Sequence, residues 1–491
     1  MLISYNFSSD YLYRVVHELI RLAFPACILT KKKKIDSDLH IEMHASEEDD
    51  QLIMEGLIVS SSNATSLKKA YILAKDNQHN QINRDMRRFC FTLLSKHQGK
   101  PISTYGVLTG VRPLKLVHRL LDADYTANEI RLTLEKEFYL HPDKASLLTR
   151  VAYNNRPYLP AKAAKAELIS VYIGIPYCPS RCYYCSFPGQ VLRNYAQELP
   201  HFLEVLFTEI KQISSYLKAN HIQVETIYIG GGTPTILTES DLALLLDVVN
   251  YYLISDATKE FTVEAGRPDT LNLSKLMILK DGGVNRVCIN PQTMNDHTLD
   301  RIGRKHTSQE TLDAVENARI AGIDIINMDI IVGLFEESKK EFELTAKKIL
   351  EVIPKNVTVH TLALKKGSAM AENERNRMEM RIREVEMGVK YFHDILAEAG
   401  YIPYYLYRQK YMRGDMENLG YSIPNNFCLY NILMIEEKQT IIGFGGGAAS
   451  KFVNPSDWSL ESIYNPKEPQ AYFNSMEGLV ARKVDKLRGL N

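Results

Sequence analysis

Segments typical of β-strands and of α-helices alternate over residues 168–364, and this alternation constrains the fold more than any other feature of the chain. The candidate strands are residues 171–175, 225–230, 261–264, 286–290, 323–331 and 356–362. The helical patterns between them cover residues 198–217, 240–253, 273–281, 308–321 and 339–352. Strands that alternate with helices form a parallel sheet with right-handed crossovers. The pattern predicts an α/β fold built on an incomplete (β/α)6 TIM-like barrel, whose reactive groups gather at the carboxyl ends of its strands.

The chain is long enough, at 491 residues, for further domains on both sides of this barrel. We expect an N-terminal α+β domain at residues 1–160, the partial barrel at residues 168–365, and a mostly helical, substrate-covering region at residues 366–491. In that last region, residues 374–399 predict a long helix that ends at Gly400.

Within the N-terminal domain, apolar or alternating runs at residues 40–43 and 51–60 flank an acidic tip and predict a β-hairpin. Helical patterns follow at residues 65–73, 82–96 and 127–138. Residues 156–165, with two prolines and an Ala/Lys run, are typical of a linker.

Three cysteines follow the first barrel strand in the sequence VYIGIPYCPSRCYYCSF. Cys178, Cys182 and Cys185 have the spacing C-x3-C-x2-C. Thiolates on one loop are the usual protein ligands of an iron–sulfur cluster, whereas structural zinc needs a fourth ligand, and no second pair follows here. Three buried, unreactive thiols are the alternative, which the prolines around the loop disfavour. We therefore predict a [4Fe–4S] cluster with one iron left open for a small molecule.

The composition excludes several other classes of protein. Basic and acidic residues balance at 59 each, so the chain has no general attraction for polyanions and we expect no nucleic-acid partner. No apolar run approaches the ~18 residues of a membrane span, and the N-terminus lacks the pattern of a signal peptide. We expect cytoplasmic localisation, where a reducing environment protects cluster thiolates. The remaining cysteines, Cys27, Cys90, Cys288 and Cys428, are scattered and are predicted to fill the core.

Polar residues mark the ends of the later barrel strands. A glycine run, Gly230–Gly231–Gly232 with Thr233, ends the second strand, and glycines there let the backbone approach a ligand or simply form a tight turn. Four side chains at similar depth follow on successive strands: Glu264, Gln292, Arg304 and Asp329. Each alone could be structural. Together they suit a zwitterionic ligand with a ribose, because a carboxylate pairs with an ammonium, Arg with a carboxylate, and Asp or Gln with hydroxyls.

These motifs resemble a known family. The cysteine spacing resembles that of radical S-adenosylmethionine (SAM) enzymes. In order and spacing, Tyr172, the cysteines, GGGTPT, the polar residues and the HTLA strand at residues 360–363 resemble the oxygen-independent coproporphyrinogen III dehydrogenase (oxidase) group. The segments GVLTGVRP and YLYRQ…ENLGY resemble its HemZ-type branch. The resemblance implies that the three cysteines are the catalytic cluster ligands. It implies a SAM site lined by Tyr172, Gly231, Gly232, Thr233, Glu264, Gln292, Arg304, Asp329, Ile331 and Ala363.

The resemblance also implies a reaction. A 5′-deoxyadenosyl radical would abstract hydrogen from a substrate propionate, and loss of CO2 and one electron would leave a vinyl group, converting coproporphyrinogen III to protoporphyrinogen IX in heme biosynthesis. The partners implied are a small tetrapyrrole substrate and an external electron donor such as flavodoxin or ferredoxin. We expect the cation-rich run with Arg408, Lys410 and Arg413 to hold the propionates.

Departures from the family pattern keep two alternatives open. Phe187 stands where the established dehydrogenases carry a fourth cysteine. The related heme chaperones carry a His-Asn-x-x-Tyr-Trp motif, of which this chain retains Asn431 alone, and the usual Gly-Ala-His-Ser end of the glycine cluster is here Gly447-Ala448-Ala449-Ser450. One alternative is a heme-binding or heme-transfer protein that uses Tyr430 or His393 as an iron ligand. The other is a radical SAM enzyme with an unrelated substrate, such as a modified RNA base.

Overall fold

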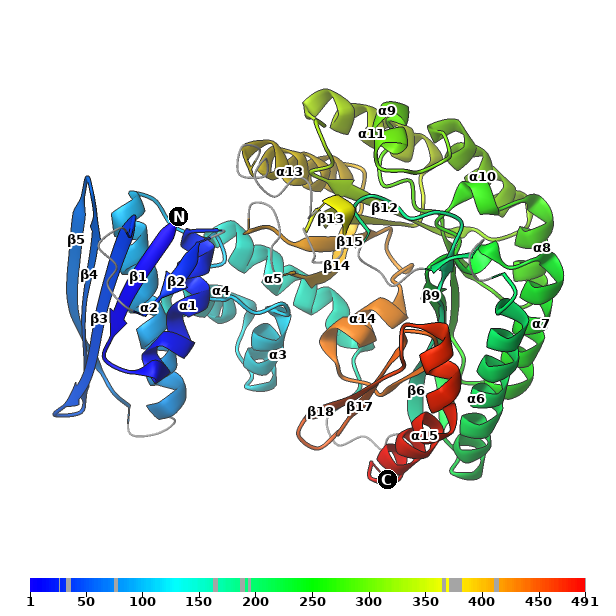
Figure 1. Ribbon diagram of the computed structural model, residues 1–491, viewed down its shortest axis with the longest axis horizontal. Coiled ribbons are helices and arrows are strands. Elements are labelled where there is room, and N and C mark those ends of the chain that lie inside the picture. The colour runs from blue at the N-terminus through cyan, green and yellow to red at the C-terminus, as the bar shows by residue number, and fades with distance from the viewer. Residues whose placement is uncertain are drawn as a thin grey trace. The chain divides into compact units, whose positions relative to one another are not determined.

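The structure is a computed structural model that describes residues 1–25, 27–31, 37–74, 78–161, 167–185, 190–192, 196–363, 368–370, 382–409 and 415–490. Its contacts divide the chain into two compact units, Met1–Arg150 and Val151–Asn491. Figure 1 draws the first unit in blue to cyan. The three-domain division expected from the sequence stays a prediction.

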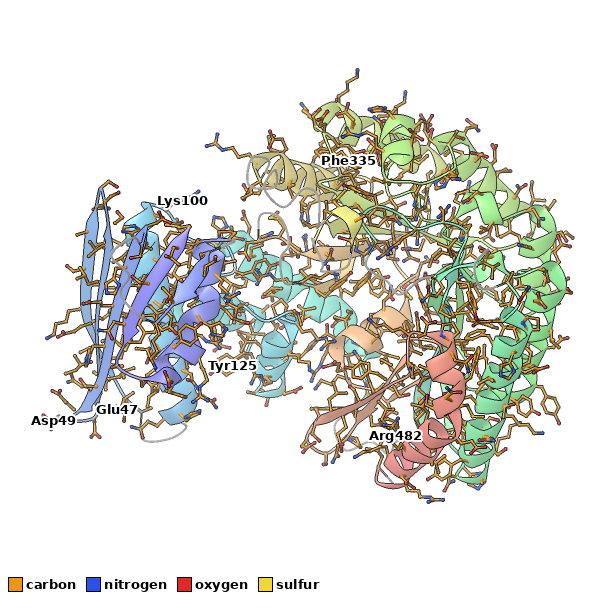
Figure 2. The ribbon with its side chains drawn as sticks, viewed as in Figure 1. Glu47, Asp49, Lys100, Tyr125, Phe335 and Arg482 are labelled. Atoms are coloured by element: carbon orange, nitrogen blue, oxygen red, sulfur yellow. The ribbon has the colours of Figure 1, made fainter. Side chains whose placement is uncertain are left out.

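The first unit is built on a five-stranded sheet in the order β2-β1-β3-β4-β5. Its strands are β1 (Leu2–Phe7), β2 (Ile28–Thr30), β3 (Leu39–Glu48), β4 (Gln51–Ser60) and β5 (Ala64–Ile72). Strands β3 and β4 pair antiparallel from Leu39↔Ser60 to Glu48↔Gln51, which confirms the predicted hairpin. Figure 2 shows Glu47 and Asp49 at the acidic tip of this hairpin.

Helices complete the first unit. Helices α1 (Asp10–Ala23) and α2 (Gln78–Gln98) pack on each other, and α2 also packs on β4 and β5. The remaining helices are α3 (Leu114–Asp122), α4 (Ala127–Phe138) and α5 (Pro142–Asn155), the last of which crosses the boundary between the units. A short 3-10 helix, η1 (Arg156–Tyr158), opens the predicted linker, and residues 162–166 of that linker lie outside the described residues.

The helix predicted at residues 65–73 is wrong, because these residues form strand β5. Leu67, Ala70 and Tyr71 have the spacing of an apolar helix face, and the prediction of a helix was based on this spacing. In the sheet, Thr65 and Tyr71 are buried while Ala64, Ser66 and Ile72 are exposed, so the side chains alternate as strand residues do. Pairing with β4 over nine residues supplies backbone hydrogen bonds that outweigh the local helical pattern.

The second unit contains the predicted partial barrel. Its parallel strands are β6 (Leu168–Ile175), β9 (Gln223–Gly231), β10 (Glu260–Glu264), β11 (Arg286–Cys288), β12 (Ile325–Val332) and β13 (Asn356–Thr361). The helices that connect them are α6 (Leu199–Ala219), α7 (Glu239–Tyr252), α8 (Leu273–Asp281), α9 (Asp296–Arg301), α10 (Ser308–Ile320) and α11 (Lys339–Val352). Figure 1 shows these helices as an outer layer around the strands, which confirms the α/β fold class.

After the barrel, the described residues form three further helices and extend the sheet at both edges. The helices are α13 (Ile382–Glu398), α14 (Leu429–Glu436) and α15 (Pro469–Arg488). The added strands are β14 (Ile402–Tyr407), β15 (Asn418–Ser422), β16 (Ile441–Gly445), β17 (Ala449–Val453) and β18 (Leu460–Tyr464). Strand β15 pairs antiparallel with β13, and β16 pairs parallel with β6. Residues 374–381 of the predicted long helix lie outside the described residues.

Within the described ranges, no helix has both the length and the apolar character that crossing a bilayer requires.

Candidate active site

The residues predicted from strand ends lie at the carboxyl-terminal end of the barrel. Gly231 and Glu264 are the last residues of β9 and β10, and Asp329 and Ile331 lie in β12. Tyr172 lies within β6, and Ala363 comes just after β13. The parallel arrangement brings these ends to one edge of the sheet, where the cysteine loop also begins.

The cysteine loop leaves β6 at the same edge. Strand β7 (Tyr177–Cys178) pairs with β8 (Gln190–Val191), and the loop between them carries the other two cysteines. All three thiols are partly buried and none is in a disulfide. Burial raises the pKa of Cys178 to about 11, and the nearby Cys185 and Cys182 add to the rise. Thiolates at such a place need a positive partner, which iron would provide.

The glycine run of β9 packs directly against this loop. Gly232 N donates to Ile175 O at 2.8 Å, and Thr233 N donates to Tyr177 O at 2.7 Å. A Cβ on Gly232 would lie 2.4 Å from Tyr177 O and 2.9 Å from Cys178 Sγ. Thr233 Oγ1 donates to Cys178 Sγ at 3.6 Å. Any larger side chain at Gly232 would therefore push the first cysteine out of place.

The donor set fits an iron–sulfur cluster. In the part of the chain that the structure describes, no three His, Cys, Asp or Glu side chains gather around a single metal ion. The three thiolates of one cluster bind three different irons. They therefore have to lie on one face of one loop, but they do not have to converge on a single metal position. The three cysteines meet that condition on one half-buried loop.

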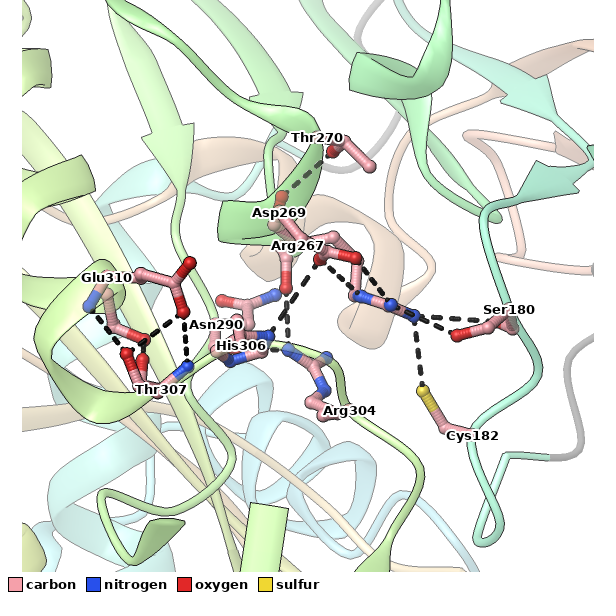
Figure 3. A network of polar contacts seen from close by, with 12 residues as sticks. Ser180, Cys182, Arg267, Asp269, Thr270, Asn290, Arg304, His306, Thr307 and Glu310 are labelled. Carbon is pink, nitrogen blue, oxygen red and sulfur yellow. Dashed lines mark hydrogen bonds and ion pairs between the residues drawn. The ribbon is translucent and has the colours of Figure 1, made fainter. Parts of the chain in front are cut away.

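Two buried arginines hold the loop from the barrel side (Figure 3). Arg267, just after β10, donates to Ser180 Oγ at 3.1 Å and to Cys182 Sγ at 3.7 Å. Arg304 donates through Nη2 to the Tyr184 hydroxyl at 3.4 Å. Its Nη1 donates to the carbonyls of Gly266 and Asn290, at 2.7 and 2.6 Å. Arg304 Nε is buried and has no hydrogen-bond partner among the described residues.

Glu264 lies beside a stack of tyrosines inside the barrel. The Tyr228 hydroxyl donates to Glu264 Oε1 at 2.9 Å. The Tyr228 ring stacks on Tyr430 of α14 at 4.6 Å between centroids and on Tyr172 at 6.1 Å. Burial raises the pKa of Glu264 to about 7, despite this hydrogen bond, and the negative charge of Asp329 adds to the rise. Glu264 is thus a carboxyl group that takes up or releases a proton near neutral pH.

Asp329 is held differently. Its Oδ1 accepts from Asn327 Nδ2 at 2.8 Å, and its Oδ2 lies 3.5 Å from His360 Nε2. Burial alone would raise the pKa of Asp329, but these contacts hold it below the usual value. Gln292 reaches the same strand through its backbone: its N donates to Asp329 O at 2.9 Å, and its O accepts from Ile331 N at 2.8 Å. The paired carboxylate of Asp329 therefore contrasts with the protonatable Glu264.

Sequence reasoning missed Arg267 and His306. Their signals, in VEAGRPD and GRKHT, are adjacent to the residues that were singled out. Arg267 has its partner Asp269 beside it in VEAGRPD, but its contacts Ser180 and Cys182 lie on the distant cysteine loop. His306 meets Asp269 from another segment, and no local pattern reveals such distant contacts. The predicted propionate partner Arg408 is instead buried in an ion pair with Asp415. Phe187, Lys410 and Arg413 lie outside the described residues.

A separate cavity of about 740 Å³ lies at the opposite end of the barrel. Its lining includes Leu168, Glu225, Glu260, Arg286 and Ile325, which begin or precede the strands. The predicted site residues do not line it. The residues predicted for the site therefore lie at the carboxyl-terminal end of the barrel and not in this cavity.

Comparisons with known proteins identify the family of the chain. The sequence model of the radical SAM superfamily matches residues 172–349. The chain is 34% identical to the oxygen-independent coproporphyrinogen-III oxidase-like protein HemZ of Bacillus subtilis (strain 168), over 97% of this chain and 96% of that protein. It is 37% identical to the heme chaperone HemW of the same strain, over 39% of this chain and 50% of that protein.

A solved structure supports the fold. Coproporphyrinogen III oxidase (HemN) from Escherichia coli, a radical SAM enzyme, aligns with a TM-score of 0.51 and 20% identity. The alignment covers 67% of this chain and 73% of that one. Proteins of this superfamily use a [4Fe–4S] cluster together with SAM. The cysteine loop at the mouth of the partial barrel and the match to HemZ over nearly the whole chain show that this protein belongs to the radical SAM superfamily, in its oxygen-independent coproporphyrinogen III oxidase-like group.

Proposed function

We propose that the chain is a SAM-dependent oxidoreductase that oxidatively decarboxylates the propionate side chains of coproporphyrinogen III. In this proposal Cys178, Cys182 and Cys185 hold the cluster, and SAM binds the iron that they leave open. When bound and reduced, this pair supplies the 5′-deoxyadenosyl radical that takes a hydrogen atom from the substrate. The observation that carries the proposal is the contact between the cysteine loop and the strand ends: Gly232 packs against Cys178, and Arg304 donates to Tyr184.

The SAM zwitterion finds partners of opposite charge in this ring. Glu264 is the partner proposed for the ammonium, because a bound cation favours the ionised form of a carboxyl whose pKa is near 7. Arg304 is the partner proposed for the SAM carboxylate. Its buried Nε donor has no partner within the described ranges, which supports an acceptor group from a ligand at this place.

The remaining predicted residues are proposed to surround SAM. Asp329 would accept hydrogen bonds from the ribose hydroxyls and Gln292 would accept or donate them, and the partly buried backbone of Gly231 and Gly232 would face the amino group. The other proposed contacts are Tyr172, Gly231, Gly232, Thr233, Ile331 and Ala363. Their location on strands that end at one edge of the sheet supports this assignment.

The proposed reaction balances as follows for each propionate. A hydrogen atom leaves the β-carbon for the deoxyadenosyl radical, the carboxylate carbon leaves as CO2, and one electron passes to an acceptor, which leaves a vinyl group. One electron must also enter to cleave SAM, so an external donor such as flavodoxin or ferredoxin is part of the proposal. The nearly full-length similarity to a coproporphyrinogen-III oxidase-like protein supports this substrate class.

A heme-carrying function is the second candidate, favoured by the similarity to the heme chaperone HemW. The two residues considered as iron ligands argue against it. Tyr430 is buried in the tyrosine stack inside the barrel, and its backbone N donates to Glu260 Oε1 at 3.1 Å. His393 shares a hydrogen bond of 2.8 Å with the Tyr421 hydroxyl. Both side chains are committed to packing or hydrogen bonds within the fold.

The test is an anaerobic turnover experiment with purified, iron- and sulfide-reconstituted protein. Coproporphyrinogen III, SAM and a reductant are incubated with the wild type and with Cys182→Ala, and the products are analysed by mass spectrometry. We expect vinyl-bearing product, CO2 and 5′-deoxyadenosine with the wild type and none with the variant. Stoichiometric, stable heme binding without any decarboxylated product would instead favour the carrier function.

A further inference from the structure

Arg267 has no part in the proposed SAM ring, yet its guanidinium group contacts the cysteine loop at Ser180 and Cys182 (Figure 3). Nη1 donates to Cys182 Sγ at 3.7 Å and to Ser180 O at 3.4 Å, and Nη2 donates to Ser180 Oγ at 3.1 Å. Arg267 is 4% exposed. A buried cation thus contacts one of the three proposed cluster ligands directly.

Asp269 fixes the orientation of this guanidinium group. Arg267 Nε donates to Oδ1 at 2.9 Å and Nη2 donates to Oδ2 at 2.8 Å, so the pair is bidentate. On the other side of Asp269, His306 Nδ1 lies 3.9 Å from Oδ1, too far for a hydrogen bond. Burial and the neighbouring Arg304 lower the pKa of His306 to about 4, so its ring is uncharged at neutral pH. Arg267 is therefore the cation that faces this carboxylate most closely.

The backbone of Arg267 is also tied to the glycine run. Its carbonyl accepts from Thr270 Oγ1 at 2.8 Å, and Thr270 Oγ1 lies 2.7 Å from Thr235 Oγ1 in GGGTPT. Thr233 in the same segment contacts Cys178. The 3-10 turn that follows Arg267, η4 (Pro268–Thr270), thus connects two of the three cysteines through hydrogen bonds.

We propose that Arg267 is a positioning residue that orders the cysteine loop and raises the reduction potential of the cluster held there, with Asp269 as its anchor. Reduction adds a negative charge to the cluster, and a nearby buried cation that donates to a ligand sulfur stabilises the reduced form. Hydrogen bonds to the sulfurs and net charge are among the factors that set such potentials. The inference rests on the cluster assignment in the proposed function.

The test measures the potential and the occupancy of the cluster. Wild type, Arg267→Gln, Arg267→Lys and Asp269→Asn are reconstituted anaerobically, iron and sulfide are counted per chain, and the midpoint potential is titrated without SAM by electron paramagnetic resonance. Arg319→Gln is the matched control, because Arg319 donates to Val352 O on the outer layer of the barrel.

We expect Arg267→Gln to shift the potential to more negative values by about 59 mV, a tenfold change in the one-electron equilibrium. Arg267→Lys keeps the positive charge but loses the planar guanidinium with its several N–H donors, so a smaller negative shift of the potential is expected. Asp269→Asn removes a negative charge but keeps an amide oxygen that accepts from Arg267, so the opposite shift is expected, which general loosening of the loop would not produce. If Arg267→Gln holds no cluster, the signs of the potential shifts in Arg267→Lys and Asp269→Asn test the proposal.

Two failures are distinguishable. Equal potentials in all variants at full iron content, or shifts of the same sign for Asp269→Asn and Arg267→Lys, would overturn the role of Arg267 while leaving the cluster in place. Absence of bound iron from the wild type itself would overturn the proposed function.

Discussion

At the scale of single residues, Glu264 is a group whose protonation depends strongly on its surroundings. Its pKa in the folded protein is about 7, compared with the usual 4.5, because the carboxyl is buried. The folded protein therefore holds this proton more tightly than the unfolded chain does. The resulting stabilisation is complete below about pH 4.5 and is lost as the pH rises through about 7.

We expect Glu264→Gln to make the cluster-free protein less sensitive to pH. The gap between 4.5 and about 7 corresponds to about 3 kcal/mol, at about 1.4 kcal/mol for each pKa unit. Melting temperatures at pH 5 and pH 8 are the measurement, and the variant should lose less stability than the wild type over this range. Glu337, whose pKa burial also raises to about 7, leaves a residual dependence. Glu316→Gln, at an exposed position, is the control. If Glu264→Gln loses as much stability between pH 5 and pH 8 as this control does, the interpretation of Glu264 as a buried acid is refuted.

SAM affinity tests the two charged partners proposed for the zwitterion. Glu264→Ala or Arg304→Ala leaves one charge of SAM unpaired in a partly desolvated site, which typically costs about 2–5 kcal/mol. Equilibrium dialysis of SAM with reconstituted protein measures this loss, with Arg319→Ala as control. Wild-type affinity in both variants would show that these side chains serve the fold alone.

Position on a strand decided which site residues could be predicted. Glu264 and Asp329 could be predicted because carboxylates on successive strands form part of one polar ring, although each alone could be structural. Arg267 contacts Ser180 and Cys182, which are more than 80 residues away in sequence, so its role depends on the packed fold. The ion pair of Arg408 with Asp415 could not be foreseen for the same kind of reason: composition does not reveal which charges pair.

At the scale of elements, α15 is tied to the barrel by a buried ion pair. Lys483 Nζ lies 2.7 Å from Glu209 Oε1 of α6 and donates to Gly443 O of β16 at 2.5 Å. Tyr472 donates to Glu209 Oε2 at 2.6 Å. These contacts hold β16 beside β6, where a Cβ on Gly445 would lie 2.3 Å from Gly174 O. The pair thus supports the strand that leads into the cysteine loop.

Lys483→Met is expected to destabilise the protein by about 3–5 kcal/mol, because it leaves the Glu209 carboxylate buried without its cation. Thermal unfolding measures the loss. Replacing both partners, as Glu209→Gln with Lys483→Met, should recover part of it, since no uncompensated charge remains. A single variant as stable as the wild type, or a double variant less stable than Lys483→Met, would contradict this role.

Most barrel elements could be predicted because their segments show one clear period, but the six-residue helix α9 was not predicted. Helices α8 and α11 begin and end at the predicted residues. Strand β5 was mistaken for a helix because its short run also fits the helical period, and only pairing with β4 decides between them. The strands after the barrel escaped prediction, because β15 and β16 are stabilised by β13 and β6, distant partners in the sequence.

At the scale of the whole molecule, the second unit contains every residue proposed to bind the cluster or SAM. Helix α14 lies against the inside of its barrel: Glu260 on β10 accepts from Leu429 N at 2.8 Å, and Tyr430 stacks on Tyr228. Tyrosine side chains therefore occupy the barrel interior. Glu264 and Asp329 lie nearer the carboxyl ends of their strands. Because the tyrosines occupy the interior and the carboxylates lie toward the cysteine loop, we expect the substrate to approach from the side of that loop.

The central claim is that a radical formed from SAM takes hydrogen from a propionate of coproporphyrinogen III. The direct measurement uses substrate deuterated at the propionate β-carbons, incubated anaerobically with reconstituted protein, SAM and reductant. If the proposed reaction occurs, 5′-deoxyadenosine gains one deuterium and forms together with the vinyl product. Unlabelled 5′-deoxyadenosine alongside intact substrate would contradict it.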